Sequence, residues 1–405
     1  EVGLRSLSAL FGTATIPLAF VLGRHVGGRR TGLVAAALCA FNPLLIWYSQ
    51  EARSYALMVL LSGLTLLALT LVLEQPSRRR FAAWTLASVA ALCTHYYAGF
   101  LVAAEAAWLL YRTPARGRAT IATGVLGAAA LALLPLALHQ RSTGAAAFIS
   151  QSSLLRRLAQ IPKQFALGYQ GPLEVAATIA AALLLAYAAL RLVSSVPGRA
   201  RRRGLVLAGL GVAAIAAPVV LAVIGPDYLI TRNVLAAWLP LGIAAAAGFA
   251  AGPASRAGVA AAAALCAIGV VMVIAVARDD RYQRDDWRAA AQALGTAQTP
   301  RAIIVTPPSG RVPLLHYLRG ARPSPPAGVD VKEIDFVGLA PRLPGEAPKP
   351  PRPPTVGAAG FTEFARTEGQ TFTVVRERSP VGTHVTPVVG ASSLDGRPAI
   401  TLFQR

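Results

Sequence analysis

Cysteine and acidic residues are scarce in this sequence. Only three cysteines occur in 405 residues, and Asp and Glu together number 18 against 39 Lys and Arg. Cys39, Cys93 and Cys266 lie inside apolar runs without CxxC spacing, so neither a disulfide framework nor a thiolate metal site is indicated. The sequence also lacks GxGxxG, Walker and HExxH motifs. The three cysteines are therefore expected to be packing residues.

Charged side chains of either sign are sparse as well. They make up 14% of the chain, hydrophobic residues make up 55%, and the mean hydropathy is +0.53, whereas a soluble domain carries about 25% charged residues. Apolar stretches close to the roughly 20 residues that a helix needs to cross a bilayer recur through residues 1–277. We therefore expect a mainly α, polytopic membrane protein with about ten spans. The predicted spans are 4–22, 31–48, 54–73, 82–97, 98–111, 119–138, 172–192, 204–224, 234–251 and 258–277.

The basic residues are placed where membrane topology would put them. A net charge of +21 would suit nucleic-acid binding in a soluble protein, but here the arginines lie in short loops and share no solvated face. Five groups fall on one side of the predicted spans: Arg24, Arg29 and Arg30; Arg78–Arg80; Arg112, Arg116 and Arg118; Arg191, Arg199 and Arg201–Arg203; and Arg256. The positive-inside bias makes that side the cytoplasm, so we expect no nucleic-acid partner.

The same topology predicts which segments face outward. They are Glu1, the turn from Gln50 to Arg53, Asp227 and everything after Arg278. A chain that starts outside, at Glu1 and without an initiating methionine, predicts an earlier helix upstream. The turn from Thr94 to Gly99 separates two short predicted spans, and the alternation of loops depends on that separation.

Residues 139–170 form the longest loop between predicted spans. Its apolar residues recur at helical spacing (Leu154, Leu158, Ile161 and Phe165), while its polar residues face elsewhere (Arg156, Arg157, Gln160 and Lys163). This pattern predicts an extracytoplasmic amphipathic segment lying at the membrane interface. Pro162 argues against a single unbroken helix there.

Residues 278–405 predict a small extracytoplasmic α/β domain. Helices are expected at Asp285–Leu294 and Arg311–Leu318, a strand at Ala302–Val305, and further strands within Phe361–Arg376 and Ile400–Phe403. The proline-rich stretch Pro341–Pro354 is expected to be an irregular linker. The acidic residues Asp279, Asp280, Asp285 and Asp286 predict helix capping and surface solvation rather than a glycosidase carboxylate pair.

One stretch combines an acid and a base at the outer end of a predicted hairpin. The residues from Phe41 to Tyr55 contain an Asn-Pro turn followed by Gln-Glu-Ala-Arg-Ser-Tyr. Charges at the membrane edge are candidates for function, and we single out Glu51 and Arg53. A purely local role is the alternative, in which these two side chains cap the hairpin or pair with each other. Tyr55 suits an interfacial aromatic belt in either case.

Several segments along the chain resemble one family in the same order. Besides the stretch just described they are Leu4–Gly12, Leu22–Arg24, Thr94–Tyr97, Thr231–Asn233 with Leu239–Pro240, and Arg284–Arg288. Together they resemble bacterial members of the family of protein O-mannosyltransferases and aminoarabinose transferases, which are GT-C glycosyltransferases of the family 39 type. The resemblance implies transfer of a sugar from a polyprenyl-phosphate carrier to a glycan, lipid or protein acceptor on the outer face.

The resemblance also implies that part of the machinery precedes this sequence. The family's catalytic acid lies in the first extracytoplasmic loop, just after the first helix, and the present sequence begins after that point. We therefore expect an N-terminally truncated chain that keeps the donor-binding half of the site and lacks the general base. Mannose and arabinose are both compatible with the resemblance.

The chemistry implied needs a carboxylate for the acceptor hydroxyl and cations for the departing phosphate. We assign Arg53 to the donor phosphate or to anchoring of the hairpin, and Glu51 to an acceptor, a metal or a supporting hydrogen bond. Arg232 is a second phosphate candidate, because a guanidinium at headgroup depth can grip a phosphate with two hydrogen bonds. The alternative for Arg232 is an interfacial arginine paired with Asp227.

His95, Tyr96 and Tyr97 lie at another outer turn and could contact sugar, donor phosphate or a metal. No second histidine or carboxylate follows His95 at helical spacing, so a structural role is the alternative. A divalent cation is a candidate cofactor that the sequence does not assign.

Two other classes of protein fit parts of the pattern. A secondary transporter would also have many helices, although internal repeats and polar residues at midplane depth are typical of transporters. A noncatalytic cell-envelope assembly subunit would use the helices only as an anchor. The high Ala and Arg content indicates a GC-rich bacterial genome, and we expect a multi-pass protein of the bacterial plasma membrane.

Overall fold

The computed structural model describes residues 2–142, 149, 152–252, 255–339, 360–387 and 398–405. The chain divides into two compact units, Glu1–Val273 and Ile274–Arg405. The predicted linker Pro341–Pro354 lies outside the described residues.

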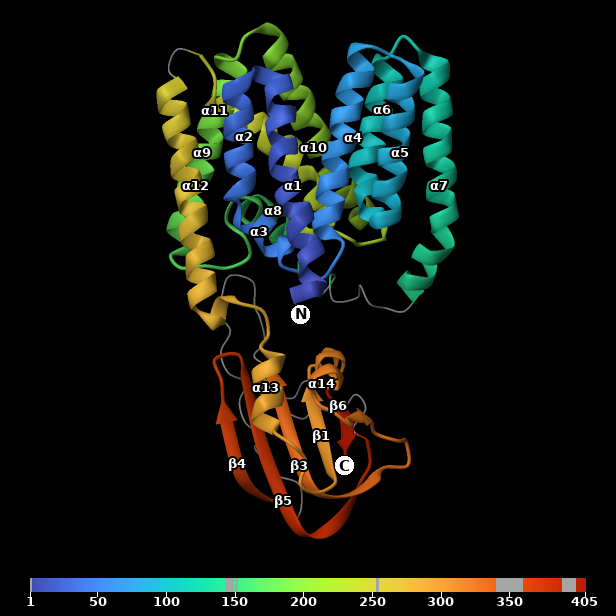
Figure 1. Ribbon diagram of the computed structural model, residues 1–405, viewed down its shortest axis with the longest axis vertical. Helices are drawn as coiled ribbons and strands as arrows, with labels where there is room; N and C mark the ends of the chain where they lie inside the picture. The colour runs from blue at the N-terminus through green and yellow to red at the C-terminus, as the bar shows by residue number, and fades with distance from the viewer. Residues whose placement is uncertain (1, 143–148, 150–151, 253–254, 340–359, 388–397) are drawn as a thin grey trace. The chain divides into compact units, whose positions relative to one another are not determined.

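The first unit is a bundle of helices (Figure 1). Its α-helices are α1 (Val2–Gly27), α2 (Arg29–Ala40), α3 (Pro43–Ser49), α4 (Tyr55–Glu74), α5 (Arg78–Thr94), α6 (Gly99–Arg112), α7 (Arg116–Ser142), α8 (Leu154–Leu167), α9 (Glu174–Ser194), α10 (Gly198–Ile224), α11 (Trp238–Phe249) and α12 (Ser255–Arg278). Short 3-10 helices η1 (Tyr96–Ala98) and η3 (Thr231–Ala237) precede α6 and α11. Every predicted span therefore coincides with helical structure.

Length separates these helices into two groups. Within the described residues, seven segments are long and apolar enough to cross a membrane: α1, α4, α7, α9, α10, η3 with α11, and α12. The pair α2 and α3 would make an eighth span, bent by 59°. By contrast α5 has 17 residues and α6 has 14, so these two predicted spans are helical but short. The chain is a polytopic, mainly helical membrane protein.

The bend between α2 and α3 has a local cause. Pro43 begins α3, and the Asn42 side chain caps it by accepting a hydrogen bond from the Leu45 N–H at 3.0 Å. The Asn42 amide also donates to the Phe165 carbonyl oxygen at 2.7 Å, and the Trp238 indole N–H donates to the same oxygen at 2.9 Å. One carbonyl of α8 thus joins the α2–α3 bend to α11.

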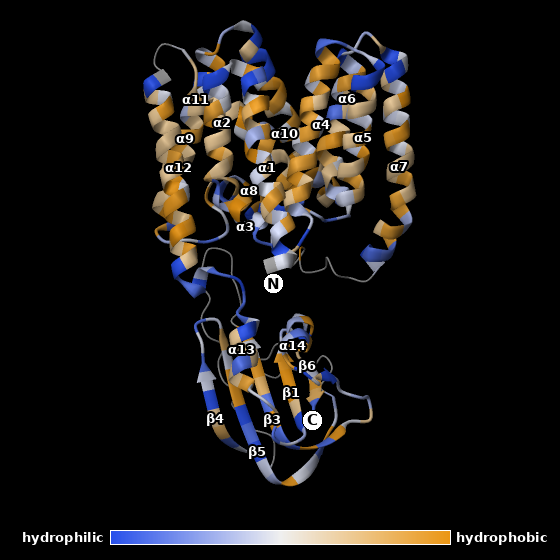
Figure 2. Cartoon of the chain, viewed as in Figure 1, coloured by the Kyte–Doolittle hydropathy of each residue, from blue (hydrophilic) through white to orange (hydrophobic). Residues whose placement is uncertain are grey.

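The arginine-rich loops gather at one end of the bundle, where Figure 2 shows hydrophilic turns capping apolar helices. Arg203 donates to the His25 carbonyl and pairs with Glu74 at 2.7 Å, which joins three of the loops. Arg118 donates to the Pro76 carbonyl at 2.9 Å and Arg191 donates to the Ala251 carbonyl at 2.6 Å. The groups that alternate along the sequence therefore share one end of the fold.

The amphipathic segment forms one continuous helix, α8, so the expected break at Pro162 is wrong. The Pro162 side chain is on the exposed face, and the helix continues for more than a turn beyond it. The expected orientation of Arg157 is also wrong, because this side chain is buried rather than turned away. Ile161 and Phe165 are buried, as the periodicity predicts.

The second unit is built around a six-stranded sheet of order β2-β6-β1-β3-β5-β4. The strands are β1 (Arg301–Thr306), β2 (Arg322–Pro323), β3 (Val329–Leu339), β4 (Thr362–Glu368), β5 (Phe372–Val385) and β6 (Ile400–Gln404), and β1 and β3 are parallel. Helices α13 (Trp287–Leu294) and α14 (Arg311–Tyr317) pack on one face of the sheet. The predicted cap of α13 is confirmed, since the Asp286 carboxylate accepts from the Ala289 N–H at 2.9 Å.

The long central strand β3 was not predicted. Its sequence contains Glu333 and Asp335, which suggest a solvated surface, but both carboxylates are fully buried. Arg301, also fully buried, pairs with Asp335 at 2.9 Å, and Arg376 pairs with Glu333 at 2.6 Å. Buried charges that are paired and hydrogen-bonded can occupy a sheet interior, and this network replaces the apolar alternation by which a strand is recognised.

Candidate functional site

The predicted site residues lie on three segments that come together away from the arginine-rich loops. Glu51, Arg53 and Tyr55 follow α3 and begin α4, while His95 and η1 join α5 to α6. Arg232 lies on η3, and η3 packs against α4, α8 and η1. Segments far apart in the sequence therefore form one surface.

Aromatic rings connect these segments. Tyr55 lies 4.7 Å from Tyr48 and 5.1 Å from His95, measured between ring centroids. The row continues from His95 to Tyr97 at 5.2 Å and from Tyr97 to Tyr228 at 5.7 Å. Tyr96 contacts both His95 and Tyr97 and is 37% exposed. Tyr48 and Tyr55 are buried, so Tyr96, at the exposed end of the row, has the accessible ring and hydroxyl group that suit contact with a sugar.

The charged residues surround Tyr55. The Tyr55 hydroxyl is within hydrogen-bonding reach of the Arg53 side chain, and both Arg232 and Glu51 act on it electrostatically. Arg232 also acts on His95. The structure thus brings together two guanidinium groups and one carboxylate, all predicted from the sequence, around one buried phenol.

Tyr169 and Lys163 belong to the same region and were missed as site residues. The hydroxyl groups of Tyr48 and Tyr169 are hydrogen-bonded, and Arg232 and Glu51 both act electrostatically on Tyr169. Lys163 donates to the Tyr169 carbonyl at 2.7 Å and pairs with Glu174 at 2.6 Å. Only the position of Tyr169 just after an amphipathic helix could have indicated it.

Asp227 pairs with Arg157. The Arg157 guanidinium binds both carboxylate oxygens of Asp227, at 2.7 and 2.5 Å, and donates to the Leu229 carbonyl at 2.8 Å. These hydrogen bonds hold the pKa of Asp227 below its usual value. Asp227 therefore ties α8 to the segment that leads into η3, the 3-10 helix that carries Arg232.

The structure offers no preformed metal cage in the part that it describes. Among those residues, no group of three His, Cys, Asp or Glu side chains is close enough to hold a metal ion. The His95 ring nitrogen Nδ1 accepts a hydrogen bond from the backbone N–H of Tyr97, with 3.4 Å between the two nitrogens. One side of this ring therefore helps to shape the turn.

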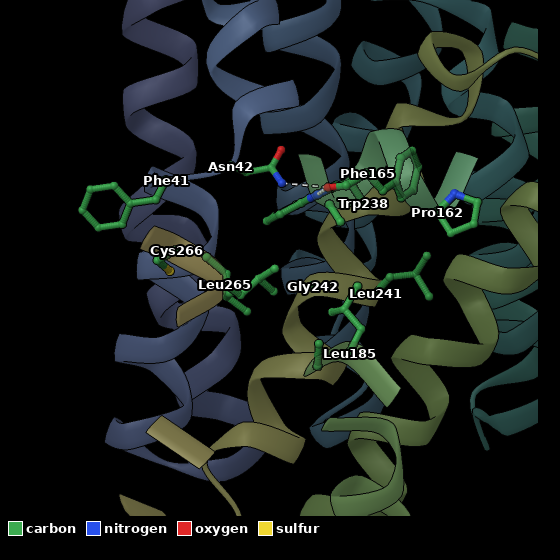
Figure 3. Close-up of a pocket in the computed structure, with 13 residues that line it drawn as sticks. Phe41, Asn42, Pro162, Phe165, Leu185, Trp238, Leu241, Gly242, Leu265 and Cys266 are labelled. Atoms are coloured by element: carbon green, nitrogen blue, oxygen red, sulfur yellow. Dashed lines mark hydrogen bonds between the residues drawn. The ribbon is translucent and has the colours of Figure 1, made fainter. Parts of the chain in front are cut away.

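An apolar cavity lies beside the α2–α3 bend, and Figure 3 shows the residues around it. Its volume is about 170 Å³, and its walls come from α2, α8, α9, α11 and α12, including Leu185, Leu241 and Leu265. The Asn42 amide and the Trp238 indole in the wall both donate to the Phe165 carbonyl, as the dashed lines in the close-up indicate. Because these polar groups are satisfied, the cavity suits a hydrocarbon.

Glu105 is a fully buried acid on α6 that the sequence reading passed over. Trp84 of α5 donates its indole N–H to Glu105 Oε2 at 2.9 Å, and Thr65 of α4 lies 2.8 Å from Oε1. The Thr65 hydroxyl also lies 2.8 Å from the Ser62 carbonyl. The Thr65 hydroxyl has a single proton to donate. It can donate that proton to the Ser62 carbonyl if Glu105 is protonated and donates in turn to the Thr65 oxygen. The acid then joins three helices without a buried charge.

This arrangement predicts different results for two substitutions of Glu105. Glu105→Gln keeps an acceptor for Trp84 and a donor for Thr65, so we expect a change of less than about 1 kcal/mol in the free energy of unfolding. Glu105→Ala removes both partners and leaves a cavity, and should cost about 2–5 kcal/mol. Thermal unfolding of both variants in detergent measures the difference. Equal losses for both would show that Glu105 is ionised.

Comparisons with known proteins show a partial likeness to a solved structure. No protein-family model matches the chain, and no curated protein matches it. Among solved structures the chain is similar to the crystal structure of ArnT from Cupriavidus metallidurans in the apo state, with 15% sequence identity and a TM-score of 0.38. The match covers 62% of this chain and 46% of that chain, so this chain spans less than half of the length of that protein.

Proposed function

We propose that the chain belongs to a membrane glycosyltransferase that moves a sugar from a polyprenyl-phosphate donor to an acceptor at the outer face of the bacterial plasma membrane. The observation that carries this proposal is the convergence of Arg53, Arg232 and Glu51 around Tyr55, at the end of the bundle opposite to the arginine-rich loops. A phosphate and a hydroxyl acceptor need these residue types side by side.

The reaction is a displacement at the anomeric carbon of the sugar. The acceptor oxygen forms a bond to that carbon and gives its proton to a carboxylate, while the bond to the phosphate oxygen breaks and polyprenyl phosphate leaves. Arg53 and Arg232 hold the phosphate, where negative charge grows in the transition state. Glu51 hydrogen-bonds the acceptor hydroxyl, and the accessible end of the ring row, at Tyr96 and Tyr97, contacts the sugar, with Tyr55 supporting it from behind.

The apolar cavity supports a lipid-linked donor. Its wall includes Trp238, which immediately follows η3, so the cavity and the Arg232 segment are consecutive in the chain. A volume of about 170 Å³ fits only a short part of an isoprenoid chain, so the cavity would hold the part next to the phosphate, and the rest of the chain would lie in the bilayer. The arginine-rich loops lie at the opposite end, and by the positive-inside bias they face the cytoplasm. With this orientation we propose that the second unit is extracytoplasmic.

The proposal is tested by measuring donor binding and sugar transfer separately. The full-length protein that contains this chain is reconstituted in proteoliposomes and mixed with a panel of radiolabelled polyprenyl-phosphate sugars, together with its variants Glu51→Gln, Arg53→Ala and the exposed control Arg29→Ala. We expect Arg53→Ala to weaken donor binding and Glu51→Gln to leave binding unchanged while transfer falls. Arg29→Ala should match the unmodified chain. Donor binding that is absent, or insensitive to Arg53, would contradict the proposal; solute flux without a new glycosidic bond would indicate a transporter.

A further inference from the structure

A second site is indicated on the outside of the bundle between α6 and α10. These two helices pack against each other, and a groove of about 800 Å³ runs between them. Small residues line much of it, including Ala104 and Ala107 on α6 and Gly209 on α10. A Cβ added at Gly209 would meet nothing within 4 Å, so the missing side chain leaves the groove open. Its size is that of a small-molecule site.

The groove has a charged and aromatic end. Arg201 and Arg202 lie in the first turn of α10, and Trp108 and Tyr111 lie in the last turn of α6. The Arg112 guanidinium lies 5.8 Å from the Trp108 ring centroid and 5.9 Å from that of Tyr111. Aromatic rings beside arginines are typical of the depth at which lipid headgroups lie. The remainder of the groove extends along two membrane helices.

The three consecutive arginines of α10 have different environments. Arg203 turns toward the bundle and pairs with Glu74 at 2.7 Å. In the part of the chain that the structure describes, neither Arg201 nor Arg202 takes part in an ion pair; Arg201 donates to the Val193 carbonyl at 3.2 Å. The acidic residue of α6, Glu105, is fully buried and is hydrogen-bonded to Trp84 and Thr65, so it does not face the groove. The described lining therefore presents positive charge and no carboxylate.

We propose that this groove is a binding site for an anionic phospholipid. The occupant must be apolar along its length, because the groove runs along the membrane-crossing helix α10 with the shorter α6 beside it, and negative at one end, because two arginines stand there. A phospholipid with a single net negative charge has this form, and basic pockets between membrane helices bind such headgroups. The site lies at the end of the bundle opposite to the proposed catalytic residues, and it does not depend on the proposed function.

Native mass spectrometry of the purified chain, titrated with phosphatidylglycerol or with zwitterionic phosphatidylcholine, tests the site. We expect at least a tenfold preference for phosphatidylglycerol, and we expect Arg201→Gln combined with Arg202→Gln to abolish it. Arg199→Gln is the matched control, because Arg199 is exposed on the same turn and does not line the groove. Gly209→Leu places a side chain in the groove and should therefore weaken the binding of both lipids.

Several outcomes would overturn the proposal. Equal losses for Arg199→Gln and for the double variant would mean a diffuse attraction without a site. Unchanged binding in Gly209→Leu would show that no acyl chain lies in the groove, and this variant still decides the question if the double variant does not fold. Displacement of phosphatidylglycerol by equimolar polyprenyl phosphate, or a dimer mass that disappears in Gly209→Leu, would identify another occupant.

Discussion

Replacing Arg232 by alanine is expected to lower sugar transfer about 100-fold or more, because removing one preorganised donor to a developing negative charge has an effect of that size. Arg232 is the cation common to the site, since its charge acts on Tyr55, His95 and Tyr169. Initial rates at saturating donor give the comparison. Arg232→Lys should recover only part of the rate, because an ammonium cannot bind a phosphate through two parallel N–H groups.

Arg116→Ala is the control for this experiment. Arg116 is exposed at the start of α7, at the opposite end of the bundle, so the same loss of charge there should leave the rate unchanged. If Arg232→Ala retains full activity while the fold is intact, the phosphate is held elsewhere and the proposed arrangement of the site is wrong.

The second large effect is expected at the pair formed by Arg157 and Asp227. Arg157→Ala leaves a carboxylate at the Asp227 position without its partner and removes a side chain that is 7% exposed, so we expect a loss of about 3–5 kcal/mol in the free energy of unfolding. A double-mutant cycle with Asp227→Ala isolates the coupling between the two side chains. If the loss in the double variant equals the sum of the losses in the two single variants, the pair contributes no coupling of its own.

The same pair predicts how stability depends on pH. The pKa of Asp227 is lowered in the folded chain by its hydrogen bonds to Arg157, so the folded state binds fewer protons at this carboxyl than the unfolded state. The contribution is therefore complete above the ordinary value of 3.8 and is lost as the pH falls through the lowered pKa. Unfolding curves in acid should show this loss in the unmodified chain and not in Asp227→Asn.

The sequence predicted the helices well because their signals are local. Apolar length identifies α4 or α12 without reference to any other segment, and Asp286 precedes α13 as a capping residue would. The arginines of every second loop predicted that these loops share one end of the bundle. That prediction needs only the order of the spans, because successive loops alternate between the two ends. The turn containing Glu51 and Arg53 was found for the same reason, as an acid and a base at one predicted hairpin.

What the sequence could not show depends on pairing between distant residues. Arg157 and Asp227 are 70 positions apart, and nothing near Arg157 distinguishes it from the exposed Arg156. Glu105 is a single acid in an apolar helix, and its partners are on two other helices. Strand β3 was missed because Glu333 and Asp335 are neutralised by arginines on other strands. In each case the partner supplies the information.

The shared carbonyl of Phe165 limits how α8 can move. This one oxygen accepts from Asn42 and from Trp238, which are 123 and 73 positions away in the chain. Lifting the C-terminal end of α8 would break both bonds together inside an apolar wall, where neither donor would find water. The other end of α8 is held by Arg157, which binds Asp227 and the Leu229 carbonyl. Because both ends of α8 are fixed, the wall that this helix gives to the cavity stays closed. Any traffic of a lipid chain into that cavity must pass between the helices from the side.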